Sequence, residues 1–287
     1  MARHESACIS KRLTDFRQRR NPRDLLTALW LVAMQGRWVE LLFGLYCTIR
    51  FRPSRVENSR NIDVDELIHH GEHQCRVRSF QRHEAIAATN AMTRSNEGLP
   101  HCRIHGVAEC EAHTFLGEYA ENSARVYVRS PDRVRIFSPY DRDARVRHIH
   151  MVHAHNGVIY IATGDSRKYL DQFTYGEGKL QRISRVVRWF GGFTAGCSIG
   201  QKLYLGTDFS GRPNYIYCLE TRERFPFPRP AFFKYCAVML PIEDRYIICV
   251  NRSLPYAAPQ RVISIFDVVE RQFIFSEICM QEAFAVD

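Results

Sequence analysis

Arg147-His-Ile-His-Met-Val-His-Ala-His-Asn156 runs directly into Gly157-Val-Ile-Tyr-Ile-Ala-Thr-Gly-Asp165, and this stretch decides the fold. It predicts one strand, a tight turn at Asn156-Gly157 and a second, apolar strand that ends in a polar tip at Asp165. The apolar strand and its tip return 43 residues later in Lys202-Leu-Tyr-Leu-Gly-Thr-Asp208, and 43 residues after that in Arg245-Tyr-Ile-Ile-Cys-Val-Asn251. Upstream, Glu118 in Thr114-Phe-Leu-Gly-Glu-Tyr119 lies 47 residues before Asp165. A repeat of this length that contains only short strands predicts the blades of a β-propeller.

Short strand patterns separated by turn residues continue from residue 113 to the end of the chain. They fall into four groups, which cover residues 115–119, 124–128 and 133–137; 148–164, 170–173 and 180–183; 193–198, 203–206 and 215–219; and 233–240, 246–250, 262–266 and 273–275. No single group is long enough to bury its own core, whereas neighbouring sheets can bury one between them. We therefore expect an all-β protein, a β-propeller with about four blades over residues 113–287.

The first 112 residues predict a helical or irregular N-terminal part. Residues 1–23 are rich in arginine and predict a basic arm. Residues 24–51 are apolar and predict a helical segment, which Gln35, Gly36, Arg37 and Glu40 interrupt. The pattern allows three structures for this segment: two helices packed on the domain, a membrane-surface anchor or a membrane span. Residues 52–112 are polar, with six scattered histidines, and we expect an irregular region there.

Composition limits the partners. The formal charge of +9 fits an anionic partner such as an acidic glycan, and it also fits a surface that arginines simply solvate. No nucleic-acid motif accompanies this charge, so we expect no nucleic-acid partner. We also expect no cofactor and no metal.

Ten cysteines contain no C-x-x-C pair, which excludes a zinc ribbon or a thioredoxin-type motif. Cys102 and Cys110 could pair in an exported protein; otherwise the cysteines are reduced and mostly buried. The N-terminus lacks the pattern of a secretory signal, and we expect a cytoplasmic protein.

The four tips are the first candidate site. If the repeats are equivalent, Glu118, Asp165, Asp208 and Asn251 lie at the same end of their strands and converge near the propeller axis. Converging carboxylates suit acid and base chemistry, because repulsion and burial can keep one protonated while another stays ionised. The alternative is that each tip is a turn former bonded to local backbone amides.

Two further groups of polar side chains adjoin the tips. His148 and His150 alternate along one strand, which predicts that both rings point to one side while His153 and His155, unless a bulge intervenes, point to the other. Such a pair could bind a metal with a third ligand, transfer protons or bind sugar, or be structural. In the loop after Asp208, Arg212 and Asn214 suit the recognition of carboxylates and hydroxyls.

Several of these stretches together carry a family resemblance. They are Gly117-Glu-Tyr119, Arg147-His-Ile-His150, Thr163-Gly-Asp165, Gly206-Thr-Asp208 and Asn214-Tyr-Ile-Tyr217, and Ser130-Pro-Asp-Arg-Val-Arg-Ile-Phe137 adds a degenerate Asp-box. In order and spacing, residues 113–220 resemble bacterial sialidase-like propeller proteins of the BNR type. The resemblance implies a propeller fold and a place in polysaccharide metabolism. The arginine triad and the tyrosine nucleophile of sialidases have no assignable counterpart in this chain.

These observations predict a glycan-interacting propeller that hydrolyses or eliminates polysaccharide. Glu118, His150, Asp165 and Asp208 are the predicted catalytic residues, and His148, Arg212 and Asn214 are predicted to bind an acidic or neutral carbohydrate. In this scheme one carboxylic acid protonates the leaving sugar oxygen, and His150 or a second carboxylate is the base. The alternative is a non-catalytic scaffold that binds another protein and docks through residues 24–51 to a partner or a membrane surface.

Overall fold

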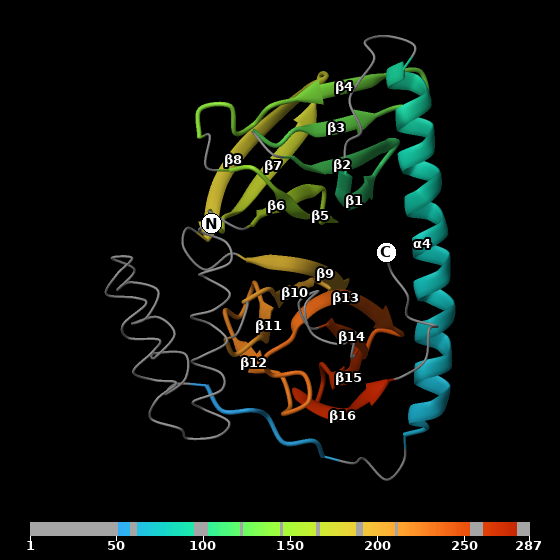
Figure 1. Cartoon of the computed structure of the whole chain (residues 1–287), viewed down its shortest axis with the longest axis vertical. Helices are drawn as coiled ribbons and strands as arrows, with labels where there is room; N and C mark the ends of the chain where they lie inside the picture. The colour runs from blue at the N-terminus through green and yellow to red at the C-terminus, as the bar shows by residue number, and fades with distance from the viewer. Residues whose placement is uncertain are drawn as a thin grey trace, which may run out of the picture.

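The protein is a four-bladed β-propeller preceded by one long helix (Figure 1). The computed structural model describes residues 51–57, 62–94, 103–120, 123–143, 146–164, 167–187, 192–209, 212–252 and 261–279. The predicted basic arm and almost all of the predicted apolar segment, residues 1–50, lie outside this part of the chain. The predicted all-β propeller is confirmed, and so is the number of blades.

Each blade is a four-stranded antiparallel sheet whose strands follow one another in sequence. Blade one contains β1 (Arg103–Cys110), β2 (His113–Tyr119), β3 (Val126–Arg129) and β4 (Val134–Phe137). Blade two contains β5 (Ile149–His155), β6 (Val158–Thr163), β7 (Leu170–Gly176) and β8 (Lys179–Val187). Blade three contains β9 (Phe193–Ile199), β10 (Lys202–Thr207), β11 (Tyr215–Cys218) and β12 (Arg224–Pro226). Blade four contains β13 (Tyr235–Ile242), β14 (Tyr246–Arg252), β15 (Arg261–Asp267) and β16 (Gln272–Cys279).

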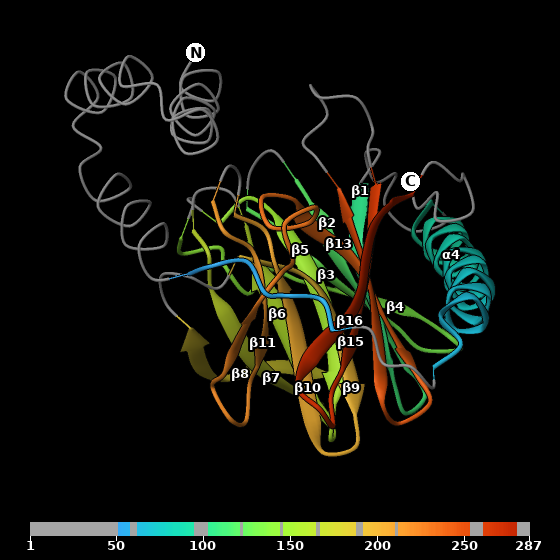
Figure 2. The same cartoon turned by 90° about the horizontal axis from the view of Figure 1, so that it is seen from below.

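The first strand of every blade is the innermost one. In sequence order, β1, β5, β9 and β13 pack against one another around the axis, and the fourth strands lie outside (Figure 1). All four hairpins between the first and second strands point to one end of the molecule, which we name the short-turn end (Figure 2). The connections between second and third strands lie at the opposite end, which we name the loop end. A side chain at the close of β2, β6, β10 or β14 therefore lies at the loop end.

The predicted hairpin in blade two is confirmed. Asn156 and Gly157 both have positive φ, 50° and 72°, which is the backbone of a tight type I′ turn. Glycine adopts this conformation without steric cost, and asparagine tolerates it better than most residues. The turn fixes the register in which His155 pairs with Val158, and the alternation of the strand then sets the direction of His153 and His155.

Residues 52–112 contain regular structure that the sequence pattern does not predict. Helix α4 (Val64–Arg94) has 31 residues, and β1 places the start of blade one ten residues before residue 113. The Asp63 side chain caps the helix by accepting a hydrogen bond from the Glu66 backbone amide at 3.0 Å. Few apolar residues mark the helix, because it buries only a narrow stripe of side chains and keeps its other faces polar.

Helix α4 completes the ring by spanning blades four and one (Figure 1). Leu67 and Cys75 pack into the core of blade four, and Ala85 packs against blade one. Between them, Arg78 donates a hydrogen bond to the backbone oxygen of Met239 on β13, and Arg82 donates one to that of Ile104 on β1. These two bonds attach the middle of the helix to the innermost strands of both end blades.

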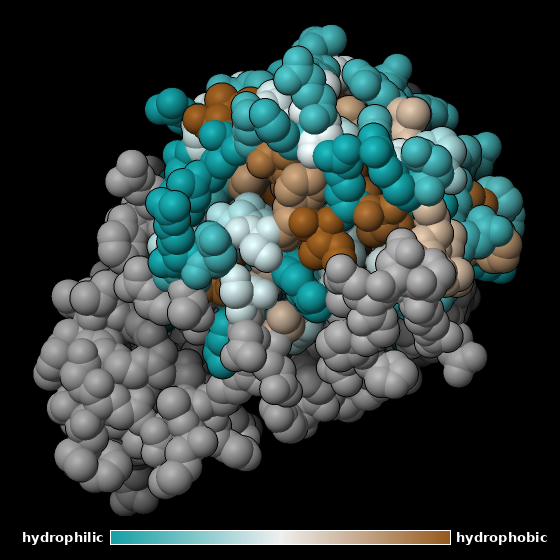
Figure 3. Space-filling view, turned by 90° about the horizontal axis from the view of Figure 1, so that it is seen from above, coloured by the Kyte–Doolittle hydropathy of each residue, from teal (hydrophilic) through white to brown (hydrophobic). Residues whose placement is uncertain are grey.

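The apolar core lies between the blades. One buried cluster joins blades one and two, a second joins blades two and three, and a third joins blades three and four. Residues 51–57 run along the outside of blades three and four, where Val56 forms a parallel bridge with Phe273. Seen from above, the described surface is largely hydrophilic around a central hydrophobic area (Figure 3). Within the described ranges, no helix is long and apolar enough to cross a membrane.

The cysteines in the described residues are free thiols, and most are buried, as expected. Burial raises the pKa of the Cys197 and Cys249 thiols well above the ordinary value. These thiols are therefore protonated core residues. Cys102 lies outside the described residues, so the suggested pair with Cys110 is not tested.

Candidate functional site

The predicted site residues lie mostly at the loop end, as equivalent repeats require. Glu118 belongs to the end of β2, Asp208 follows β10 directly, and Asn251 belongs to the end of β14. Asp165 lies outside the described residues. His148 and His150 also reach this end, because β5 starts there.

His150 and Asp208 are the pair that the structure brings together. His150 Nδ1 lies 3.7 Å from Asp208 Oδ2, across the boundary between blades two and three. A bulge in β5 between Ile149 and Met151 places His150 out of the regular register with β6. Its ring packs on Gly164, where a Cβ atom would overlap it. Because the bulge and the glycine fix the ring position, the approach to Asp208 follows from the backbone.

Aromatic rings from blades one and two surround this pair. The Tyr119 ring stacks on His150 with ring centroids 5.7 Å apart, and it meets the edge of His148 at 3.7 Å. On the side of blade one, the exposed His105 ring stacks on Tyr119 at 4.4 Å. We name these five residues, His105, Tyr119, His148, His150 and Asp208, the axial site. Three blades contribute to it.

Positive charges lie next to the axial site. Lys168 Nζ donates a hydrogen bond of 2.8 Å to the backbone oxygen of Asp208. Burial raises the pKa of Tyr235 on β13, the Asp208 carboxylate raises it further, and Arg252 lowers it. Asp208 therefore acts on blade four as well. Asp208 itself is 19% exposed, so its carboxylate is accessible to a ligand.

Glu118 has hydrogen-bond partners within its own blade, and its predicted catalytic role stays a prediction. Its carboxylate is buried and accepts hydrogen bonds from Arg125 Nε at 2.8 Å and Arg125 Nη2 at 2.7 Å. The Arg125 backbone amide and the Tyr127 hydroxyl donate two more. A carboxylate with this many donors stays ionised, which is unsuited to a proton donor. Glu118 thus links β2 to β3.

Asn214 has a structural environment as well. Its side-chain oxygen accepts hydrogen bonds from the Thr207 hydroxyl and the Phe209 backbone amide, and its nitrogen donates to the backbone oxygens of Phe209 and Arg212. The residue is fully buried, so it shapes the loop after Asp208 and has no surface for a substrate. Arg212 is half-buried in the same loop, and its predicted role stays a prediction.

The fourth tip, Asn251, differs from Asn214. Its side chain is fully buried, and neither its oxygen nor its nitrogen has a hydrogen-bond partner in the described part of the chain. Leaving both groups unpaired costs free energy, so a polar partner is expected near this tip.

The arrangement suits proton transfer and the binding of a polar ligand. An imidazole beside a carboxylate is a common acid and base pair, and stacked rings provide flat faces for a sugar. Within the described ranges, no group of three or more His, Cys, Asp or Glu side chains could hold a metal ion. The sequence did not indicate His105 and Tyr119. For Tyr119 the sequence shows only that it follows Glu118 in the repeated tip.

No protein-family model matches the chain, and no curated protein matches it in sequence. Among solved structures, it is similar to the Drosophila Semaphorin 1b extracellular domains 1-2 with 13% identity and a TM-score of 0.40. The match covers 58% of this chain and 37% of the semaphorin chain, so this chain corresponds to well under half of that protein. None of these comparisons supports a sialidase-like family, and the propeller fold is the part of that resemblance that the structure bears out.

Proposed function

We propose that this protein binds an acidic carbohydrate at the axial site and transfers protons to or from it through His150 and Asp208. One observation carries the proposal: three blades deliver stacked rings and a His150–Asp208 pair to one accessible place at the loop end. Ring faces pack against the C–H groups of a sugar, and the Asp208 carboxylate accepts hydrogen bonds from its hydroxyls.

The charges around the site favour an acidic sugar. Lys168 donates a hydrogen bond to the backbone oxygen of Asp208, Arg252 lies close to Tyr235, which the Asp208 carboxylate also influences, and the whole chain carries a formal charge of +9. A sugar carboxylate placed near these cations would gain more than a neutral hydroxyl, because a charged hydrogen bond contributes about 1.5–3 kcal/mol. This supports a uronic acid as the bound unit.

Of the two predicted reactions, elimination needs fewer groups than hydrolysis. Glycoside hydrolysis uses two carboxyl groups, whereas the Glu118 carboxylate is bound by Arg125. In elimination, His150 takes the proton from the carbon next to the sugar carboxylate. The electron pair forms a carbon–carbon double bond, the glycosidic C–O bond breaks, and the leaving oxygen receives a proton from Tyr119. Asp208 stabilises the protonated imidazole.

Calorimetric titration with a uronic-acid oligosaccharide and a neutral oligosaccharide of equal length tests this function. We expect the acidic ligand to bind more tightly, and His150→Gln and Asp208→Asn to weaken it about 10-fold or more. The exposed His83 and Asp132 supply the matched controls His83→Gln and Asp132→Asn, which should bind as the unmutated protein does. Formation of the double bond is followed by ultraviolet absorbance.

Equal affinity in all four variants, or no binding of either oligosaccharide, contradicts the proposal. Binding without an ultraviolet signal removes the elimination step and leaves the binding function. The scaffold alternative makes a different prediction. A scaffold would bind its protein partner equally well with Asp208→Asn and would lose it when residues 24–51 are deleted.

A further inference from the structure

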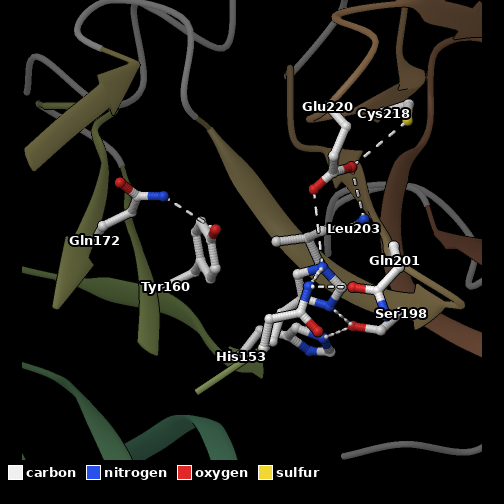
Figure 4. Close-up of polar contacts among 10 residues, drawn as sticks. His153, Tyr160, Gln172, Ser198, Gln201, Leu203, Cys218 and Glu220 are labelled. Carbon is white, nitrogen blue, oxygen red and sulfur yellow. Dashed lines mark hydrogen bonds and ion pairs between the residues drawn. The ribbon is translucent and has the colours of Figure 1, made fainter. Parts of the chain in front are cut away.

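A second group of reactive side chains lies at the short-turn end, on the boundary between blades two and three. The hydroxyl of Ser198 on β9 lies between two imidazoles of β5 (Figure 4). Ser198 Oγ is 2.9 Å from His153 Nε2 and 2.8 Å from His155 Nδ1. His153 and His155 share a face here, as the strand alternation predicts, and this face meets blade three. His150 meets blade three as well, because the bulge between Ile149 and Met151 interrupts the alternation.

The neighbours of His155 determine the direction of these hydrogen bonds. The Asn156 amide nitrogen, which can only donate, lies 3.0 Å from His155 Nε2 and 3.1 Å from Gln201 Oε1. His155 Nε2 is therefore an acceptor, so the ring proton is on Nδ1 and is donated to Ser198 Oγ. The single hydroxyl proton of Ser198 then points to His153 Nε2. The chain of bonds runs from Asn156 through His155 and Ser198 to His153.

Charged groups on two other elements face these histidines, namely Arg78 on α4 and Glu220 in blade three. Burial, the positive charge of Arg78 on α4 and the neighbouring His155 lower the pKa of His153 to about 4. His153 is therefore neutral and able to accept the serine proton at neutral pH. Glu220, in the turn after β11, holds one oxygen 3.8 Å from His155 Nε2 and accepts the Leu203 backbone amide with the other. It faces His155 from blade three.

A polar groove of about 500 Å³ lies on the same boundary, farther from the axis. Its lining combines polar and apolar side chains, namely Gln172, Ser184, Val186, Tyr217, Leu219 and Arg222. Gln172 donates a hydrogen bond to the Tyr160 hydroxyl, and the Tyr160 ring lies 6.4 Å from that of His155 (Figure 4). Leu219 directly precedes Glu220. Tyr160 therefore lies between the groove and the Ser198 group, on the side from which the remainder of a substrate could extend.

We infer that Ser198 is a nucleophile for carboxylic esters, with His153 as its base and His155, which donates to the serine oxygen, as a positioning residue. Ser198 is half-buried, so an ester carbonyl can approach it from the short-turn end. This site is separate from the axial site and does not depend on the function proposed for it. Val186 and Leu219 in the groove suit an acyl chain, while Gln172 and Arg222 suit a hydroxylated or acidic part.

The reaction is balanced with the groups present. Ser198 Oγ attacks the ester carbon while its proton moves to His153 Nε2. The bond to the alcohol breaks, and the alcohol oxygen leaves with that proton. Water then attacks the acyl serine, gives its proton to His153 and releases the carboxylic acid, and the proton returns to Ser198. Because a base with a low pKa accepts protons weakly, an activated probe should react more readily than an ordinary ester.

Labelling the full chain with a fluorophosphonate probe tests this inference. In this reaction the phosphorus–oxygen bond to Ser198 forms, fluoride leaves and His153 takes the proton. We expect mass spectrometry of the labelled protein to place the adduct on Ser198, and Ser198→Ala to abolish it. His153→Gln should reduce the labelling rate about 10-fold or more, and the rate in the unmutated chain should rise with pH through about 4.

Two comparisons keep the result specific. Ser130, a half-buried turn serine that donates to Asp132, has no histidine partner in the described residues, so Ser130→Ala should label like the unmutated chain. His150→Gln, at the axial site, should leave labelling unchanged. The peptide map needs no variant, so it stays decisive even if Ser198→Ala fails to fold. No adduct, or an adduct only on other serines, overturns the inference, and so does undiminished labelling in His153→Gln.

Discussion

Replacing Gly164 by alanine should move His150 away from Asp208. A Cβ atom at Gly164 would overlap three atoms of the His150 ring, namely Cε1, Nε2 and Nδ1. The ring is 7% exposed and lies against Tyr119, so it cannot swing out into water without disturbing its neighbours. The new methyl group and the ring would then compete for one space.

This overpacking should lower the free energy of unfolding by about 1–3 kcal/mol. For a folded unit of this size, each kcal/mol lowers the melting temperature by about 2–4 °C, so Gly164→Ala should lower it by about 2–12 °C. The backbone at Gly164 does not have positive φ, so the cost is steric. If the proposed function holds, affinity for the acidic oligosaccharide should fall together with stability.

Gly176→Ala is the matched control. Gly176 ends β7, nothing lies within 4 Å of the position that a Cβ atom would take there, and its φ is not positive either. Alanine there should be neutral or stabilise by about 0.4–1 kcal/mol, because it restricts the unfolded chain. Differential scanning calorimetry of both variants measures the difference. If Gly164→Ala melts at the same temperature as Gly176→Ala, the close packing of His150 on Gly164 is refuted.

Two other substitutions probe buried charges. Asp171 is fully buried, and its carboxylate accepts hydrogen bonds of 2.7 and 3.0 Å from Arg185. Asp171→Asn should therefore lower the free energy of unfolding, measured in urea, by about 2–3 kcal/mol; the loss is less than for a fully buried pair because Arg185 keeps some access to water. Asp132 is exposed, so Asp132→Asn should change the free energy of unfolding little. Equal urea midpoints for Asp171→Asn and Asp132→Asn would contradict this account. For His153, the folded pKa of about 4 lies below the ordinary 6.5, so the unfolded chain binds a proton between these pH values that the folded chain does not. Stability should therefore fall by up to about 3 kcal/mol as pH drops from 6.5 to 4, and His153→Gln should flatten this dependence; an unchanged pH profile in that variant would disprove it.

The blades could be predicted because each one repeats the same local signals. An apolar second strand, a polar tip and a glycine or asparagine turn are all visible within a few residues, and their 43-residue spacing identifies the repeat. Helix α4 could not be predicted in this way. It packs mainly through isolated small or apolar residues such as Gly71 and Ala85, whose role depends on blades that come later in the chain.

The site was predictable only in part, for a related reason. The sequence pattern predicts that His148 and His150 lie near each other, and repeat equivalence predicts Asp208 close to them, whereas the bulge that sets the direction of His150 is not visible in the pattern. What the sequence pattern does not contain is the partner of each charge. Arg125, which holds Glu118, is seven residues away and pairs across two strands, and nothing in the local pattern distinguishes it from the other arginines.

The same limit applies to Ser198. Its two histidines belong to another blade, 43 and 45 residues earlier in the chain, and only the ring of blades brings them within hydrogen-bonding distance. Serine on a strand carries no signal of its own. The pair of histidines at 153 and 155 is visible in the sequence, but its partner is not.

Closure of the ring by α4 has a mechanical consequence. Each sheet contains only consecutive strands, so no strand of one described blade is shared with another. Among the described residues, a force that pulled blades one and four apart would meet the side-chain contacts of α4 and its hydrogen bonds to backbone oxygens, without a ladder of strand hydrogen bonds between the two blades. Apolar clusters join each blade to the next from blade one to blade four, and α4 joins the two end blades. With a rise of about 1.5 Å per residue, its 31 residues span about 46 Å, and this length sets how far the two end blades can stand apart.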